Sequence, residues 1–199
     1  MTKKLVLTFD DGPDSIYTNQ LLDLLKSQKI KATFFLVAKN ALKLPGLVKR
    51  IKNEGHCIAL HSLEHRHALL CGYRYFSLDF SNSMDIFRDL KCDIKYYRPP
   101  WGARNLFTKY LVKRHGLIMV LWDVMVQDWK RHSSSQEIAD KIENRIFDGA
   151  ILCLHDGCEK YGGEKMVTPQ MIEALKLVLP KLKNEGWQFI TVEEYFDNA

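Results

Sequence analysis

Short apolar segments alternate along this chain with longer amphipathic segments. This alternation predicts strands and helices in turn, and hence a parallel sheet whose strands are joined by helices. In the amphipathic segments, apolar side chains recur three or four residues apart, as on a helix packed against a core. We expect strands at 5–9, 33–37, 57–60, 95–98, 118–121, 150–154 and 188–190, and helices at 17–28, 46–53, 78–90, 106–114, 136–147 and 169–184.

A chain of this kind can close into a barrel or remain an open sheet with helices on both faces, and the pattern alone leaves both open. In either architecture, ligands bind beyond the carboxyl ends of the strands. Polar side chains that directly follow the expected strands are therefore the candidate functional residues.

The composition indicates one compact domain. The 199 residues are 46% hydrophobic and 27% charged, a profile typical of a globular core and unlike that of disordered or coiled-coil chains. We therefore expect a single domain over residues 1–199. The formal net charge is only +5, and the basic residues are scattered along the chain, so we expect no nucleic-acid partner. The pattern indicates no particular oligomeric state.

Two features bear on the compartment. No apolar run approaches the roughly 18–20 residues that span a bilayer, and the first residues show no apolar stretch followed by a cleavage site. The five cysteines are an odd number without a C-x-x-C pair, which disfavours a disulfide framework and a thiolate zinc knuckle. We therefore expect free thiols, no transmembrane segment and a cytoplasmic location.

Carboxylates and imidazoles follow two of the expected strands. Asp10 and Asp11 end the first strand within T-F-D-D-G-P at 8–13, and a carboxylate buried there needs a cation as partner. Alone, this segment also fits a simple turn. His61 and His65 follow the third strand, and on a helix their spacing would place both imidazoles on one face. Two histidines with one such carboxylate form a metal site that leaves positions open for water and substrate.

Three further polar side chains follow the later strands. Arg98 ends the fourth strand, and its guanidinium can hold a carboxylate with two hydrogen bonds. His155 follows the apolar segment 150–154 and is a side chain that titrates near neutral pH. Asp128, beyond the fifth strand, is a carboxylate that can orient it.

The residues resemble a known family in five ordered motifs. These are T-F-D-D-G-P at 8–13, H-S-x-x-H at 61–65, R-P-P-W-G at 98–102, D-W at 128–129 and L-H-D at 154–156. The chain is therefore similar to the polysaccharide deacetylases of carbohydrate esterase family 4, also called the NodB homology domain. The resemblance implies an α/β fold, a distorted (β/α)7 TIM-like barrel, and metal-dependent hydrolysis of N-acetyl, or sometimes O-acetyl, groups on a carbohydrate substrate.

Carried over position by position, the resemblance also implies residue roles. Asp11, His61 and His65 would bind one divalent metal ion, zinc by default, with cobalt, manganese, nickel or iron as alternatives. Asp10 would be the general base and His155 the general acid. Arg98 would hold Asp10, and Asp128 would tune His155. Trp101, Trp129, Cys153 and Leu154 would bind the substrate.

Other functions fit parts of this pattern. The family commonly has Leu where this chain has Cys153, and the smaller side chain leaves room for a different acyl group. A deformylase or another amide hydrolase, acting on a small or lipid-linked intracellular sugar, is therefore an alternative. A catalytically silent sugar-binding module would use Trp101, Trp122 and Trp129 as stacking faces. A non-haem Fe(II) oxygenase also uses two histidines and one carboxylate as metal ligands. In such an enzyme, however, Asp10 and His155 would have no role.

Overall fold

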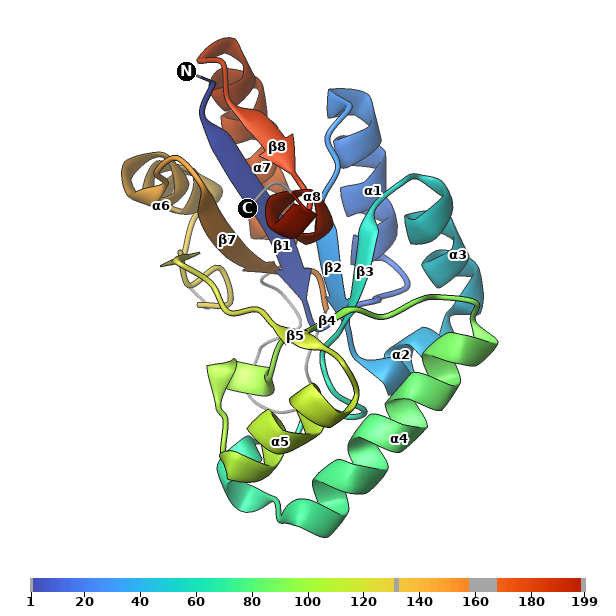
Figure 1. Cartoon of the computed structure of the whole chain (residues 1–199). Helices are drawn as coiled ribbons and strands as arrows, with labels where there is room; N and C mark the ends of the chain where they lie inside the picture. Colours follow the sequence, from blue (N-terminus) through green and yellow to red (C-terminus); the bar gives the residue numbers. More distant parts are fainter. Residues whose placement is uncertain (1, 131–132, 158–167, 198–199) are drawn as a thin grey trace.

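The computed structural model describes residues 2–130, 133–157 and 168–197 (Figure 1). Its centre is a curled sheet in which every pair of neighbouring strands is parallel. The strands run in the order β5-β4-β3-β2-β1-β7-β6, and β8 pairs with β1 beside this path. This half-barrel is the distorted (β/α)7 barrel that the resemblance predicts. The strands are β1 (Lys4–Asp10), β2 (Thr33–Leu36), β3 (Cys57–Leu60), β4 (Tyr96–Tyr97), β5 (Ile118–Met119), β6 (Val124–Met125), β7 (Ala150–His155) and β8 (Gln188–Ile190).

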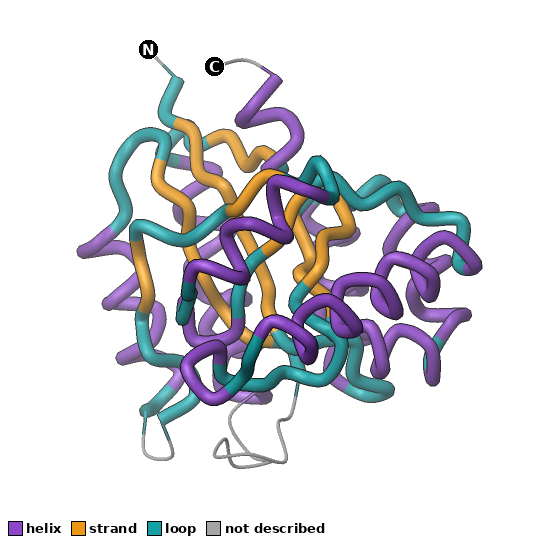
Figure 2. Tube along the Cα trace, turned by 60° about the horizontal axis from the view of Figure 1, so that its bottom comes forward, coloured by secondary structure: helices purple, strands orange, loops and turns teal. Residues whose placement is uncertain are grey.

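Helices connect the strands and surround the sheet (Figure 2). The α1 helix ends where Lys29 adopts the left-handed conformation, and α6 begins at a capping box between Ser134 and Glu137. None of the described helices has the length and apolar composition needed to cross a membrane. The helices are α1 (Tyr17–Gln28), α2 (Ala38–Lys43), α3 (Pro45–Asn53), α4 (Tyr73–Asp89), α5 (Leu106–Arg114), α6 (Ser135–Arg145), α7 (Thr168–Asn184) and α8 (Val192–Asp197), with 3-10 turns η1 (Ala68–Leu70) and η2 (Pro100–Gly102).

The two faces of the sheet bury different side chains. Leu5, Leu7 and Phe9 of β1 pack with the apolar faces of the helices in the larger core cluster. Val6 belongs to a second, smaller cluster, to which Val192 of α8 contributes. Because side chains alternate along a strand, residues 8 and 10 share the inner face with Val6. The inside of the half-barrel is therefore apolar near the amino ends of its strands and polar near their carboxyl ends.

The cysteines agree with the expectation of free thiols as far as the structure describes them. Cys57, Cys71, Cys92 and Cys153 form no disulfide bond. Cys158 lies outside the described residues.

Candidate active site and metal centre

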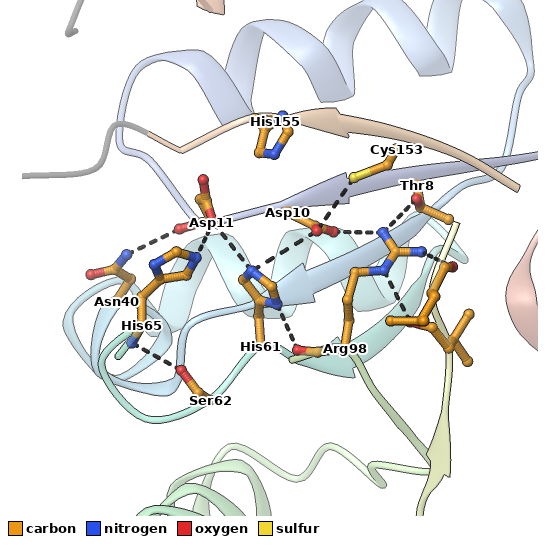
Figure 3. Close-up of polar contacts among 12 residues, drawn as sticks. Thr8, Asp10, Asp11, Asn40, His61, Ser62, His65, Arg98, Cys153 and His155 are labelled. Carbon is orange, nitrogen blue, oxygen red and sulfur yellow. Dashed lines mark hydrogen bonds and ion pairs between the residues drawn. The ribbon is translucent and has the colours of Figure 1, made fainter. Parts of the chain in front are cut away.

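Three predicted metal ligands converge at the carboxyl ends of β1 and β3 (Figure 3). Asp11 Oδ1 lies 3.3 Å from His61 Nε2 and 3.2 Å from His65 Nε2. All three side chains are buried, and one potential ligand atom of each lies within 4.8 Å of the others. The structure therefore brings together the two-histidine, one-carboxylate group that the sequence predicts.

The two histidines meet through a loop and not along a helix. The segment 61–65 contains no helical turn, and both Ser62 and His65 adopt left-handed backbone conformations, with φ of 69° and 56°. The backbone N–H of His65 donates to Ser62 Oγ at 2.9 Å. The Nδ1–H of His61 donates to the Arg98 carbonyl at 2.7 Å, which directs Nε2 toward Asp11. Such outer hydrogen bonds orient metal-binding histidines, and strained backbone is common at functional sites.

The Asp11 cluster fits a divalent cation. Asp11 Oδ1 is buried and receives no hydrogen bond of good geometry from the described residues, although two imidazole nitrogens face it. Burial alone would raise the pKa of the Asp11 carboxyl, but His61 and His65 hold that pKa well below its usual range. One oxygen and two nitrogen donors suit zinc and other first-row transition metals. A cation among them would satisfy the buried carboxylate.

Asp10 is held by a buried arginine. Arg98 Nη1 donates to Asp10 Oδ1 at 2.7 Å and to Thr8 Oγ1 at 2.8 Å. The other guanidinium donors bind backbone carbonyls, Nε to Val120 at 3.1 Å and Nη2 to Leu121 at 2.9 Å. Because β4 and the segment after β5 both fix this guanidinium, Asp10 has a set orientation, with Oδ2 directed away from Arg98.

His155 is oriented by Asp128. His155 Nδ1 lies 2.9 Å from Asp128 Oδ1, and the backbone N–H of His155 donates to Asp128 Oδ2 at 2.8 Å. Burial alone would lower the pKa of His155, but the charge and hydrogen bond of Asp128, with the charges of Asp11 and Asp10, raise it to about 10. The Trp129 ring packs edge-on against the imidazole, with centroids 5.0 Å apart. The surroundings of His155 therefore favour its protonated form.

The predicted substrate-binding residues do not all reach the site. Trp101 has a left-handed backbone with φ of 53°, and its half-exposed ring lies edge-on to His65, with centroids 4.2 Å apart. Cys153 Sγ lies 3.4 Å from Asp10 Oδ2. Leu154 is fully buried in the larger core cluster, on the side of the sheet covered by helices. We therefore leave Leu154 out of the site proposed below, because neighbouring residues on a strand face opposite sides.

The residue roles carried over from the resemblance leave out a buried carboxylate behind the metal cluster. Thr18 Oγ1 donates to Asp156 Oδ2, and the backbone N–H of Asp156 donates to the Asp10 carbonyl at 3.1 Å. Burial raises the pKa of Asp156, and although Thr18 opposes this, the charges of Asp11 and Asp10 add to it, giving about 7. A Cβ at Gly12 would lie 2.6 Å from both Asp156 carboxylate oxygens. The third letter of L-H-D was the sequence signal for this residue, whereas nothing in the sequence marks Thr18.

Comparison with known proteins identifies the family. Residues 1–120 match the family model described as polysaccharide deacetylase. The chain is 34% identical to a peptidoglycan-N-acetylglucosamine deacetylase of Bacillus cereus, over 96% of this chain and 87% of that protein. It is 30% identical to a chitooligosaccharide deacetylase of Sinorhizobium fredii, over 91% of this chain and 86% of that protein. A family 4 acetyl xylan esterase from Clostridium thermocellum, in complex with a cobalt ion, has the same fold, with a TM-score of 0.86 and 27% identity over 98% of this chain and 91% of that chain.

The chain therefore belongs to the polysaccharide deacetylase family, carbohydrate esterase family 4. Its enzyme class is that of the carbohydrate deacetylases, which hydrolyse N-acetyl amides. The family depends on a metal ion, and the Asp11 cluster is the candidate site for that ion in this chain.

Proposed function

We propose that this chain removes N-acetyl groups from a carbohydrate, releasing acetate and a free amine, with one divalent metal ion held by Asp11, His61 and His65. The observation that carries the proposal is the placement of a base and an acid beside the Asp11 cluster. Asp10 and His155 are register partners on β1 and β7. The relatives named as deacetylases of peptidoglycan and of chitooligosaccharides support an N-acetylated carbohydrate as the substrate.

Zinc is the metal that we propose, because one carboxylate oxygen and two histidine nitrogens are the protein ligands of many catalytic zinc sites. A bound divalent ion lowers the pKa of water and polarises a carbonyl oxygen. An amide needs such assistance because its carbonyl is a weak electrophile and its amine is a poor leaving group.

Asp10 is the proposed general base. Arg98 Nη1 donates to Oδ1, so Oδ2, which lies 3.4 Å from Cys153 Sγ, is the oxygen that accepts the proton. Asp10 takes this proton from the water that attacks the acetyl carbon. Proton transfer to a positioned carboxylate of this kind contributes about 10²–10⁴-fold to a rate.

His155 is the proposed general acid. Asp128 holds Nδ1 and raises the pKa of the imidazole, so Nε2 carries the proton needed by the departing nitrogen. When the carbon–nitrogen bond breaks, this proton passes to the amine, and acetate leaves with the oxygen from water. A carboxyl group held by Arg98 and an imidazole held by Asp128 thus take the roles of base and acid.

Trp101, Trp129 and Cys153 are the proposed substrate contacts. Trp101 stands beside His65, and Trp129 stands beside His155, so the two rings flank the metal ligands and the acid. We propose that the backbone N–H of Trp101 stabilises the developing negative charge on the acetyl oxygen. Trp129 and Cys153 would then contact the acetyl methyl group.

The proposal includes a single domain over residues 1–199. The pairing of β8 with the first half of β1 supports it, because this pairing joins segments near both ends of the described chain in one sheet. The two segments contribute to the same interior cluster through Val6 and Ile190.

Acid release from a substrate panel tests the proposed reaction. Metal-stripped protein, with and without one equivalent of zinc or cobalt, is incubated with chitin oligosaccharides, peptidoglycan, acetylxylan, and N-acetyl or N-formyl monosaccharides. We expect metal-dependent acetate from at least one N-acetyl sugar. Release of formate without acetate would instead establish the deformylase alternative. Acid release at the same rate with and without added metal would contradict the proposal.

A further inference from the structure

A second group of ligand-type side chains lies beside the Asp11 cluster. One potential ligand atom each of Asp10, Cys153 and His155 lies within 4.8 Å of the others. Strand geometry brings them together, because Asp10 and His155 are register partners and Cys153 precedes His155 by two residues on the same face of β7. Figure 3 shows the three side chains converging between β1 and β7.

The outer contacts of this group leave one donor atom of each side chain directed inward. Arg98 occupies Asp10 Oδ1, while Oδ2 lies 3.4 Å from Cys153 Sγ. Asp128 occupies His155 Nδ1, so Nε2 is directed inward and can bind a metal ion once it has lost its proton. A carboxylate on the far nitrogen of a histidine is the usual outer contact of zinc-binding imidazoles. The group thus has both the ligands and the supporting contacts of a metal site.

The chemistry of the donors selects the ion. A thiolate, an imidazole and a carboxylate are the three ligand types that zinc accepts in proteins, whereas magnesium and calcium prefer oxygen ligands. The Asp11 cluster contains no sulfur. The two groups therefore differ in the metals that they favour and in the spectra that a bound ion would give.

We propose that Asp10, Cys153 and His155 form a second, thiolate-containing zinc site, and that a zinc ion bound there inhibits the enzyme. Binding releases two protons to solvent, the thiol proton of Cys153 as the sulfur–zinc bond forms and the Nε2 proton of His155 as the nitrogen–zinc bond forms. The zinc ion then occupies the electron pairs of Asp10 Oδ2 and His155 Nε2. The inhibition rests on the proposed function, which makes these two atoms the proton acceptor and donor, whereas the binding does not rest on it.

Metal titration of stripped protein tests the binding. With zinc, we expect the wild type to bind two equivalents by native mass spectrometry. With cobalt, we expect a thiolate-to-cobalt charge-transfer band in the near ultraviolet, since the Asp11 cluster contains no sulfur. Cys153→Leu and Cys153→Ser should bind one equivalent and lack the band. One equivalent in the wild type, or an unchanged band in both folded variants, would overturn the site.

Two control variants separate the sources of the signal. Cys92 is buried, but it belongs to no three-ligand group among the residues that the structure describes, so Cys92→Ser should keep both equivalents and the band. Asp11→Asn should lose the sulfur-free equivalent and keep the band. A band that disappears in Cys92→Ser would assign the thiolate elsewhere and contradict the proposal.

Activity against zinc concentration tests the inhibition. Each variant is normalised to its own rate with one equivalent of zinc, and excess zinc should lower the wild-type rate about tenfold or more, because both proton-transfer groups are occupied. The ratio for Cys153→Leu should stay near unity. If two equivalents bind without inhibition, the inhibitory role is wrong. A cobalt band without deacetylation at any metal level would keep the second site and reject the proposed function.

Discussion

Arg98 Nη1 and Asp10 Oδ1 form an ion pair, 2.7 Å apart, in which the arginine side chain is fully buried and that of Asp10 is 3% exposed. The same guanidinium binds carbonyls beyond β5, so the pair links the proposed base to the opposite part of the sheet. Removing one partner of a buried ion pair leaves an uncompensated charge and costs about 3–5 kcal/mol.

We therefore predict that Arg98→Met lowers the free energy of unfolding by about that amount and lowers kcat. Urea denaturation measures the first effect. The double variant Arg98→Met/Asp10→Asn serves as control, because it leaves no unpaired charge and should recover part of the lost stability. Equal stability of the wild type and Arg98→Met would show that this pair does not hold the base.

Asp10 and Asp11 are adjacent in sequence, but the proposal gives them different tasks. Asp10→Asn should lower kcat by about 10²–10⁴-fold and keep one equivalent of zinc at the Asp11 cluster. Asp11→Asn should weaken zinc binding at that cluster, because one of its three ligands loses its charge. Metal content after dialysis and acetate release, measured on both variants, check this. Loss of the cluster's zinc in Asp10→Asn alone would mean that the two roles are exchanged.

The pH dependence of kcat/KM tests the role of His155 as the general acid. His155 acts while protonated, so the rate falls as the pH rises through the pKa of its imidazole. Asp128 raises that pKa, and Asp128→Asn should therefore move the alkaline limb to lower pH. His155→Ala should lower kcat by about 10²–10⁴-fold. An alkaline limb that stays in place in Asp128→Asn would remove Asp128 from the control of this group.

Asp156 predicts a pH effect on stability. Its pKa is raised from 3.8 to about 7 in the fold, so its contribution to stability is fully present below the lower value and is lost as the pH rises to the upper one. Asn cannot titrate. The melting temperature of Asp156→Asn minus that of the wild type should therefore increase between about pH 4 and pH 7. A difference that is constant or decreases over this range would contradict the burial of an ionisable carboxylate at this position.

The sequence predicted the helices α1 and α5 at 17–28 and 106–114 because their periodic patterns are strong. The short apolar runs at 57–60 and 188–190 also match strands, β3 and β8. The strand β6 was missed, because Val124–Met125 is too short to show a period of two. The helices α2 and α8 were missed for a similar reason, since each has six residues.

At the site, the order of the motifs predicted which side chains converge, but the local geometry needed the structure. His61 and His65 meet through a loop with left-handed residues, which no helical spacing predicts. The partner of Asp156 is Thr18, which lies far away in sequence and within an ordinary helical pattern. Contacts of this kind depend on the packing of a helix against a strand end, and a local sequence pattern does not record them.

The most direct test of the account is acetate release from the best N-acetyl sugar of the panel. Zinc or cobalt is added back in steps to the metal-stripped protein, and the rate is measured after each addition. We predict no acetate without metal and a rate that rises with the first equivalent bound. Asp11→Asn, His61→Ala and His65→Ala should fail to show this rise at the same metal concentrations. Acetate release that is independent of metal, or a full rise in these three variants, would contradict the assignment of the Asp11 cluster as the catalytic metal centre.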